Sequence, residues 1–204
     1  MEIALAERLR RCLDPAPAVE TFSRAQAAVV LALTDEQSPH LLLIRRSLHL
    51  ALHPGEIAFP GGKREPGDAD LRAAALREAW EEVALPADRF LSCGCLTPRT
   101  SMSNLAVSAF VGVMPAGMTL RADVGEVEEM LYVPLEFFAE RAHLRVDQVW
   151  RRGIARRAAR YQYRHYTIWG MTAGFIVDLV NRLYGAGLVV AAPGAGFSEG
   201  RNVI

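Results

Sequence analysis

The stretch that decides the fold runs from Gly62 to Leu85 and reads GKREPGDADLRAAALREAWEEVAL. It contains the clearest helix of the chain, which we expect over residues 69–84. Either Asp68 or Asp70 can cap the beginning of this helix, and Pro86 lies just past its end.

At about 100° per residue, this helix has an apolar side and an acidic side. The apolar side, which we expect to pack on a sheet, holds Leu76, Ala79, Trp80 and Val83. The acidic side, which we expect to face outward, holds Glu78, Glu81 and Glu82. One interpretation is a solvated acidic face, neutralised in part by an Arg77–Glu81 pair. The other is a divalent-cation site, because Mg²⁺ is usually held by one or two carboxylates together with substrate phosphates.

The loop before the helix favours the cation site, because Pro60-Gly61-Gly62 allows a close approach of the backbone. Loop and helix together resemble the signature of Nudix hydrolases. That signature is Gly, five residues, Glu, seven residues, then Arg-Glu, an apolar residue, any residue, Glu-Glu, any residue, Gly and an apolar residue. Residues 77–85 match its second half, except that Ala84 replaces Gly. In the first half Asp68 replaces Glu, and eight residues separate it from Arg77.

Flanking segments resemble a narrower group within this family, the coenzyme A pyrophosphatases. The segments are LIRRS at 43–47, Gly55, FPGG at 59–62, GCLTP at 94–98 and IWGMTAGFI at 168–176. An aspartate such as Asp68 as the first acid is also usual in this group. Ala51 stands where the group's motif has its second arginine, so other substrates stay open.

The resemblance implies a Nudix fold of the α/β (α+β) class, in which a mixed sheet is sandwiched between helices and the signature forms a catalytic loop–helix–loop. It implies Mg²⁺- or Mn²⁺-dependent hydrolysis of a nucleoside diphosphate derivative. Coenzyme A or its thioesters would give 3′,5′-ADP and 4′-phosphopantetheine or its acyl form. Two alternatives stay open: a Nudix hydrolase of nucleoside triphosphates, dinucleotides or sugar nucleotides, and a catalytically weak nucleotide-binding sensor.

The resemblance also implies roles for single residues of the helix. Glu78 and Glu82 are expected to be the principal metal ligands. Glu81 is expected to complete the carboxylate cluster, as a further ligand or through a water. We expect Arg77 to orient Glu81 or a neighbour rather than to touch the substrate.

Further site residues are expected outside the helix. The segment GEVEEM at 125–130 offers a general base or another metal ligand, for which we favour Glu126; a solvated acidic edge is the alternative. Arg46 stands at the arginine position of the flanking motif, and its planar fork suits phosphate oxygens. With Ser47 and Gly61-Gly62 it makes the expected substrate-binding set, although Arg46 alone would equally fit a solvated strand end.

The rest of the chain predicts one domain of alternating strands and helices. Strands are expected at 27–34, 40–46, 90–96, 105–114 and 127–133, and the turn DEQSP at 35–39 predicts a hairpin between the first two. A short helix at 135–140, a late hairpin of 143–151 with 159–167, and a last helix at 168–184 follow. We expect residues 1–24 to form an N-terminal helix and connector, 25–184 the Nudix domain, and 185–204 a flexible tail.

Composition excludes several classes of function. The 204 residues carry 23 Lys and Arg against 23 Asp and Glu, and this neutrality disfavours binding to nucleic acid or anionic membranes. The arginine- and tyrosine-rich segment 151–164 is then either the outer face of a hairpin or a nucleotide-binding patch. Cys12, Cys93 and Cys95 lack metal-ligand spacing and fit a reduced, cytoplasmic protein. No apolar stretch reaches the length of a membrane span, so we expect a soluble protein. A homodimer stays open.

Overall fold

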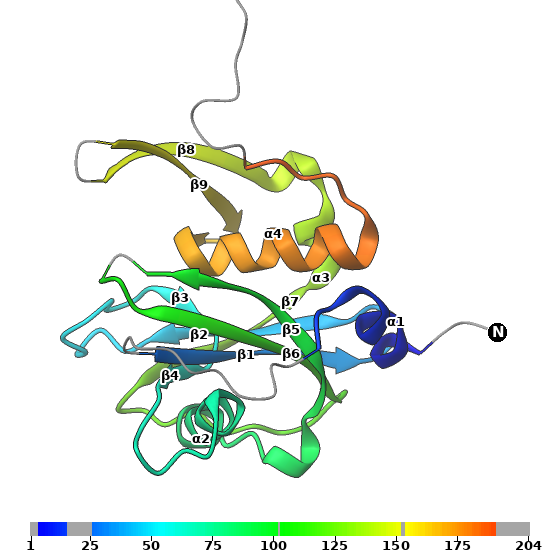
Figure 1. Ribbon diagram of the computed structural model, residues 1–204, viewed down its shortest axis with the longest axis vertical. Helices are drawn as coiled ribbons and strands as arrows, with labels where there is room; N and C mark the ends of the chain where they lie inside the picture. The colour runs from blue at the N-terminus through cyan, green and yellow to red at the C-terminus, as the bar shows by residue number, and fades with distance from the viewer. Residues whose placement is uncertain (1–3, 16–25, 102, 152–153, 191–204) are drawn as a thin grey trace, which may run out of the picture.

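The computed structural model describes residues 4–15, 26–101, 103–151 and 154–190 (Figure 1). The helices are α1 (Leu5–Cys12), α2 (Leu71–Val83), α3 (Leu135–Ala139) and α4 (Gly170–Tyr184), with 3₁₀ turns η1 (Ala87–Arg89) and η2 (Arg141–His143). The strands are β1 (Gln26–Asp35), β2 (His40–Arg46), β3 (Ile57–Ala58), β4 (Gly61–Lys63), β5 (Leu91–Thr100), β6 (Ala106–Pro115), β7 (Val127–Pro134), β8 (Leu144–Arg151), β9 (Ile154–Tyr163) and β10 (Tyr166–Trp169). Among these described elements, no helix is long and apolar enough to cross a membrane.

A mixed sheet built around β1 is the centre of the described structure. Its strand order is β3-β2-β1-β6-β5, and in addition β4 pairs with β1 and β7 pairs with β2. β1 runs parallel to β6, from Gln26 opposite Ala106 to Asp35 opposite Pro115. Both strands are buried along nearly their whole length, because helices cover both faces of the sheet.

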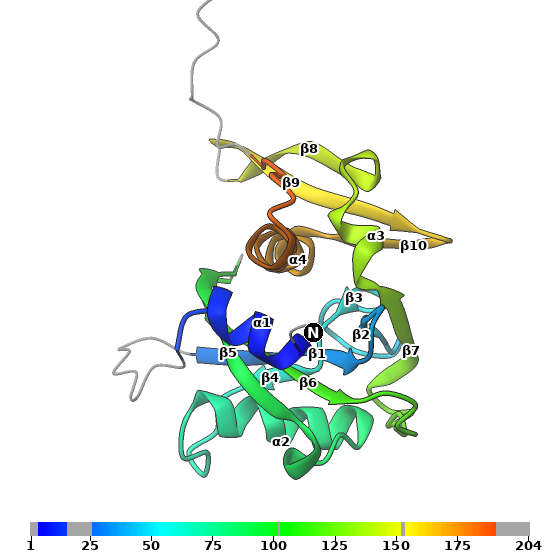
Figure 2. The same cartoon turned by 90° about the vertical axis from the view of Figure 1, so that its right-hand side faces the viewer.

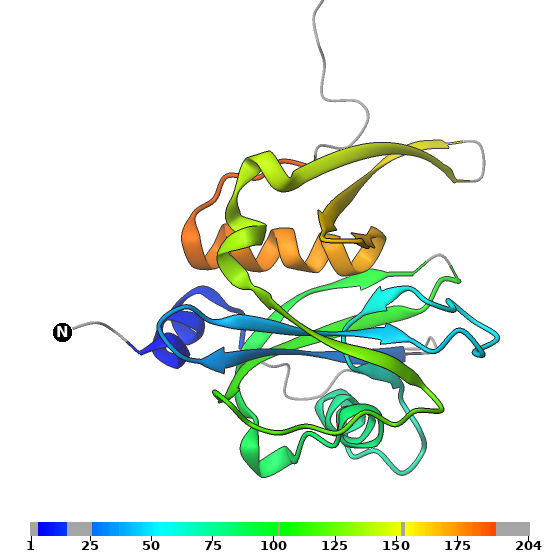
Figure 3. The same cartoon turned by 180° about the vertical axis from the view of Figure 1, so that it is seen from behind.

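The layers of the molecule follow one another clearly in the three views. α2 lies under one face of the large sheet, while α1 and α4 lie on the opposite face (Figures 1 and 2). In a small sheet of order β10-β9-β8, strands β8 and β9 lie beyond α4, whereas β10 lies beside α4 and contacts β3 (Figures 2 and 3). The expected α/β architecture, a mixed sheet between helices, is confirmed.

Side-chain alternation along the central strands divides the apolar interior into two cores. Leu31 and Leu43 belong to the core on the α4 side of the sheet. Val30 and Ile44 belong to the core on the α2 side. Because successive residues of a strand point to opposite faces, one strand supplies both cores.

The expected strands of the large sheet are confirmed to within a few residues. The turn at 35–39 does join β1 to β2, but their register is short and centres on Leu33 opposite Leu41. The long partner of β2 is β7, from His40 opposite Pro134 to Arg46 opposite Val127. The expected short helix after β7 is confirmed as α3.

The expected late hairpin is confirmed in part: β8 pairs with β9, but the second strand, expected over residues 159–167, begins earlier and is interrupted by a turn. The chain forms three strands there, because a second turn lies at Arg164 and His165. Arg164 has a φ of 53°, a left-handed conformation that ends β9. β10 continues through Trp169, so the last helix begins at Gly170 rather than at residue 168.

The expected faces of α2 also need correction. Trp80, expected on the sheet, is 56% exposed, whereas Glu82, expected outward, is 2% exposed. The helix packs on the sheet through the small side chains of Ala75 and Ala79, and this rotation turns Glu82 inward. The buried carboxylate accepts a hydrogen bond from the Gly61 N–H at 2.9 Å, which offsets part of its desolvation.

Both ends of the described chain pack against the domain. Leu5 and Leu9 of α1 belong to the core on the α4 side of the sheet. After α4, the Asn181 side chain binds both the N–H and the carbonyl of Leu188 at 2.8 Å, and Leu188 is buried. The domain limits at 24/25 and 184/185 stay predictions, and residues 16–25 and 191–204 lie outside the described residues.

Candidate active site

The Gly61-Gly62 segment positions the loop between the sheet and α2. In β4, Gly61 pairs with Val29 and Gly62 with Ala28. Gly61 has a φ of 149°, and a Cβ there would lie 2.3 Å from the Ala28 carbonyl oxygen. A Cβ on Gly62 would lie 2.4 Å from the carboxylate carbon of Glu78. The glycines therefore let the strand approach β1 on one side and the Glu78 carboxylate on the other.

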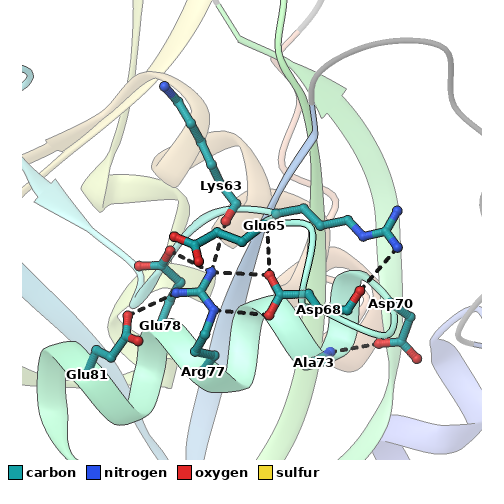
Figure 4. A network of polar contacts seen from close by, with 9 residues as sticks. Lys63, Glu65, Asp68, Asp70, Ala73, Arg77, Glu78 and Glu81 are labelled. Atoms are coloured by element: carbon teal, nitrogen blue, oxygen red, sulfur yellow. Dashed lines mark hydrogen bonds and ion pairs between the residues drawn. The ribbon is translucent and has the colours of Figure 1, made fainter.

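Arg77 ties this loop to the helix (Figure 4). Its guanidinium donates to both oxygens of Asp68, at 3.0 and 3.2 Å, and to the Lys63 carbonyl at 3.1 Å. It also donates to Glu78 at 3.1 Å and to Glu81 at 2.9 Å. The Arg77 guanidinium lowers the pKa of Asp68 below its usual range. One arginine thus fixes the loop and two carboxylates at once.

Glu82 is the most deeply buried carboxylate of the group. Burial raises its pKa to about 8, although the Gly61 N–H and the Arg46 guanidinium both act against the rise. The Arg46 Nη1 lies 3.6 Å from Glu82 Oε1. Burial also raises the pKa of Glu78. Glu78 and Glu82 therefore both lie in surroundings that disfavour the ionised form of a carboxylate.

Glu126 approaches these carboxylates from a separate part of the chain. The loop before β7 meets the end of β2, where the Ser47 N–H donates to the Glu126 carbonyl at 2.8 Å. The negative charge of Glu126 raises the pKa of both Glu78 and Glu82. Glu129, by contrast, accepts a hydrogen bond from the Tyr166 hydroxyl. The structure thus brings Glu126 toward Glu78 and Glu82, while Glu129 serves another contact.

Comparison with known proteins adds to this geometry. The family model described as NUDIX domain matches residues 23–151. The chain belongs to the Nudix family. It is accordingly a Nudix hydrolase, a pyrophosphohydrolase of nucleotide-type substrates, and members of the family typically depend on divalent metal ions.

Curated Nudix relatives cover most of the chain. Proteins named "Uncharacterized Nudix hydrolase NudL" from Salmonella paratyphi B and Salmonella typhimurium are each 39% identical over 167 residues, or 82% of this chain and 87% of theirs. The solved structure of DR0079 from Deinococcus radiodurans aligns over 84% of this chain and 98% of its own, with a TM-score of 0.50 and 17% identity. This structural likeness concerns the fold alone.

The Nudix carboxylates fit a divalent cation in their chemistry. Within the described residues, no three His, Cys, Asp or Glu side chains converge as a ready metal site, and the arginines engage the carboxylates instead. Yet carboxylate oxygens are the ligands that Mg²⁺ and Mn²⁺ prefer. Mutual repulsion and burial of Glu78 and Glu82 are relieved when a cation neutralises them. The residues present therefore fit the metal that the family uses.

The structure also places two parts of the Nudix chain that sequence reasoning left uncertain. Asp68, which departs from the family pattern, accepts two hydrogen bonds from Arg77. In the sequence, only its position after Pro66-Gly67 and before the helix indicated that Asp68 has a structural role. The arginine-rich segment lies largely on β9, in the small sheet, where Arg160 pairs with Asp147 of β8 at 2.6 Å. That cross-strand pair fits the interpretation of an outer sheet face.

Proposed function

We propose that this Nudix hydrolase cleaves the pyrophosphate linkage of coenzyme A or its thioesters, giving 3′,5′-ADP and 4′-phosphopantetheine or its acyl form. The observation that carries the hydrolytic chemistry is the burial of Glu78 and Glu82 beside the Gly61-Gly62 loop, where the charge of Glu126 also raises the pKa of both. The coenzyme A preference is supported by the motif LIRRS at 43–47, followed by FPGG at 59–62. A Nudix hydrolase of other nucleotides is the competing function, because Ala51 departs from that motif.

In this proposal the carboxylates of α2 bind the metal ion. Glu78 and Glu82 hold the divalent cation, with Glu81 as an outer member of the cluster. When bound, this cation neutralises charge on the phosphoryl oxygens and lowers the pKa of the attacking water. The Gly61 N–H fixes the Glu82 carboxylate, and Arg77 positions Glu78 and Glu81.

Residues outside α2 bind the substrate and accept the proton of the attacking water. Arg46 binds a phosphate of the substrate through its guanidinium, whose Nε is buried without a hydrogen-bond partner in the described structure. Ser47 and the Gly61-Gly62 backbone complete the binding set beside it. Glu126 accepts the proton of the attacking water, because this exposed carboxylate lies next to the two buried ones.

The test is a product assay by mass spectrometry. The protein is incubated with coenzyme A, and in parallel with nucleoside triphosphates, NADH and ADP-ribose, each with Mg²⁺, with Mn²⁺ and with chelator. We expect metal-dependent 3′,5′-ADP and 4′-phosphopantetheine from coenzyme A, above the products of every other compound. Faster turnover of another compound would overturn the coenzyme A assignment and leave the Nudix chemistry standing.

A paired substitution tests the site itself. Glu82→Gln should lower kcat/KM at least about 100-fold, because it removes a charged metal ligand and keeps the side-chain shape. The matched control is Glu136→Gln, at an exposed position on α3, which should keep full activity. Normal turnover by Glu82→Gln would exclude this carboxylate from the site.

A further inference from the structure

A second feature of the described structure is a cleft between β3 and β10, which we name the β3–β10 cleft. Its volume is about 270 Å³, and the residues that line it include Arg45, Glu56, His165, Tyr166 and Trp169. β10 lies against β3 on the side of the sheet that α4 covers (Figure 2). The cleft is therefore on the opposite sheet face from α2.

The cleft and the candidate active site meet at the end of β2. Arg46 points toward Glu82 on the α2 side, with 3.6 Å between Nη1 and Oε1. Arg45, its neighbour, lines the cleft on the other side. Arg45 and Arg46 are consecutive, so their Cα atoms are about 3.8 Å apart, while their side chains lie on opposite faces of the sheet.

Arg45 is available for an anion. Among the described residues no ion pair or hydrogen bond occupies its guanidinium, although the side chain is half-buried. Two acids beside the cleft have other hydrogen-bond partners. Glu129, opposite Arg45 in the sheet, accepts from the Tyr166 hydroxyl, and Glu56 contacts His53 at 3.0 Å. A planar guanidinium without a carboxylate partner suits a phosphate.

Aromatic surface completes the cleft. Trp169 is 47% exposed although it belongs to a strand that packs against the domain. His165 lies beside Tyr166, with ring centroids 3.8 Å apart. Exposed aromatic side chains bind nucleobases by stacking, at about 1–3 kcal/mol per base. The volume is below that of pockets for drug-sized ligands, about 300–1,000 Å³, so the cleft suits one end of a substrate rather than its whole length.

We propose that the β3–β10 cleft binds the nucleoside end of the substrate and selects for a phosphate on its ribose. Trp169 stacks on the base, and Arg45 pairs with the ribose phosphate, which is separate from the pyrophosphate that is cleaved. This assignment rests on the proposed function. In it, the residues on the α2 side of the sheet bind the pyrophosphate, and the cleft binds the nucleoside end.

Kinetics on two substrates test the role of Arg45. Coenzyme A and dephospho-coenzyme A share the scissile pyrophosphate and differ only in the ribose 3′-phosphate. Arg45→Gln should raise KM for coenzyme A about tenfold, the cost of one charged hydrogen-bond pair, and leave KM for dephospho-coenzyme A and both kcat values unchanged. The matched control is Arg89→Gln, at an exposed position in η1, which should change neither substrate. An equal effect on both substrates, or none, would overturn the proposal.

Calorimetric titration of the metal-free protein provides a readout independent of turnover. We expect 3′,5′-ADP to bind more tightly than 5′-AMP, and Arg45→Gln to abolish that difference. Trp169→Leu should weaken both nucleotides about equally, since both contain the base. Unchanged binding in both variants would overturn the cleft assignment. If the wild-type protein cleaves neither coenzyme A compound, the proposed function fails, while this titration still decides for or against the cleft.

Discussion

At the scale of single residues, Gly62 shows how the absence of a side chain positions a carboxylate. A Cβ there would meet the Glu78 carboxylate at 2.4 Å, whereas a Cβ on Gly67 would meet nothing within 4 Å. Gly62→Ala should displace Glu78 and lower kcat/KM about 100-fold, because misplacement by about 1 Å costs this much. The fold should survive, since the contact is with the end of a flexible side chain.

Gly67→Ala is the matched control, in the same loop and without a clash. Steady-state kinetics and thermal unfolding of both variants make the measurement. Equal activity of Gly62→Ala and Gly67→Ala would contradict the placement of Glu78.

The burial of Glu82 makes stability depend on pH in the metal-free protein. Its pKa is about 8 when folded, against 4.5 for a glutamate side chain in water, so between these values the folded state holds a proton that the unfolded state has lost. The free energy of unfolding should therefore fall as pH rises from about 4.5 to about 8, by at most about 1.4 kcal/mol per pH unit for one group. Urea unfolding with chelator present measures this slope.

The variant Glu82→Gln isolates the contribution of this carboxyl. It should flatten the pH dependence over the same window, because the amide does not titrate. Glu78, whose pKa is also raised by burial, adds a change of the same sign that remains in the variant. An identical slope in the wild type and the variant would show that Glu82 is not the titrating group.

Residue orientation was the part of the site that sequence could least determine. The type and spacing of Glu78, Glu81 and Glu82 allowed a cation site as well as a solvated acidic face, but the helical projection put all three outward and Trp80 inward. The actual rotation depends on Ala75 and Ala79 against the sheet and on the Gly61 N–H, which come from separate parts of the chain. No periodicity within one helix contains that information.

At the scale of elements, the end of α2 carries a local strain that can be relieved. Ala84, at the C-cap, has a φ of 54°, which is unfavourable for a residue with a Cβ. Ala84→Gly should raise the free energy of unfolding by about 1 kcal/mol. Gly185 has the equivalent position after α4, with a φ of 62° and open space around its Cβ position, so Gly185→Ala should have the opposite effect. Denaturant unfolding checks both; stabilisation by Gly185→Ala would contradict this account of the two helix ends.

Most of the longer elements were predictable because each has a local signal in the sequence, whereas the short strands β3 and β4 were not predicted. Continuous apolar runs marked β1, β2 and β6, and Pro86 marked the end of α2; of the two predicted caps, Asp68 and Asp70, the structure has Asp70. The late region was mispredicted because its turn at Arg164 contains no Gly, Pro, Asn or Asp. A positive φ at an arginine is decided by the packing of the three-stranded sheet.

At the scale of the whole molecule, binding of a divalent cation should stabilise the fold. A ligand at about 100 times its Kd adds about 2.7 kcal/mol, which corresponds to a Tm increase of about 5–10 °C for a domain of this size. Thermal unfolding with Mn²⁺ against chelator measures the increase. Glu82→Gln should abolish most of it, and Glu136→Gln should keep it. A full increase in Glu82→Gln would place the cation elsewhere.

The arrangement of whole elements was predictable in class and not in detail. The mixed sheet between helices was expected, but the β3–β10 cleft was not. It joins residues near 55 with residues near 167, and neither segment carries a signal for the other. Long-range pairing of this kind is decided by tertiary packing.

The parallel pairing of β1 with β6 has a consequence for how the protein is made. During synthesis the Gly61-Gly62 loop and α2 leave the ribosome before β6, yet β1, on which that loop rests, pairs along its whole length with the later strand. Glu126 follows later still. A nascent chain that ends before residue 106 lacks the parallel partner of β1 and the segment that carries Glu126, so we expect the carboxylate site to be complete only after most of the chain has been synthesised.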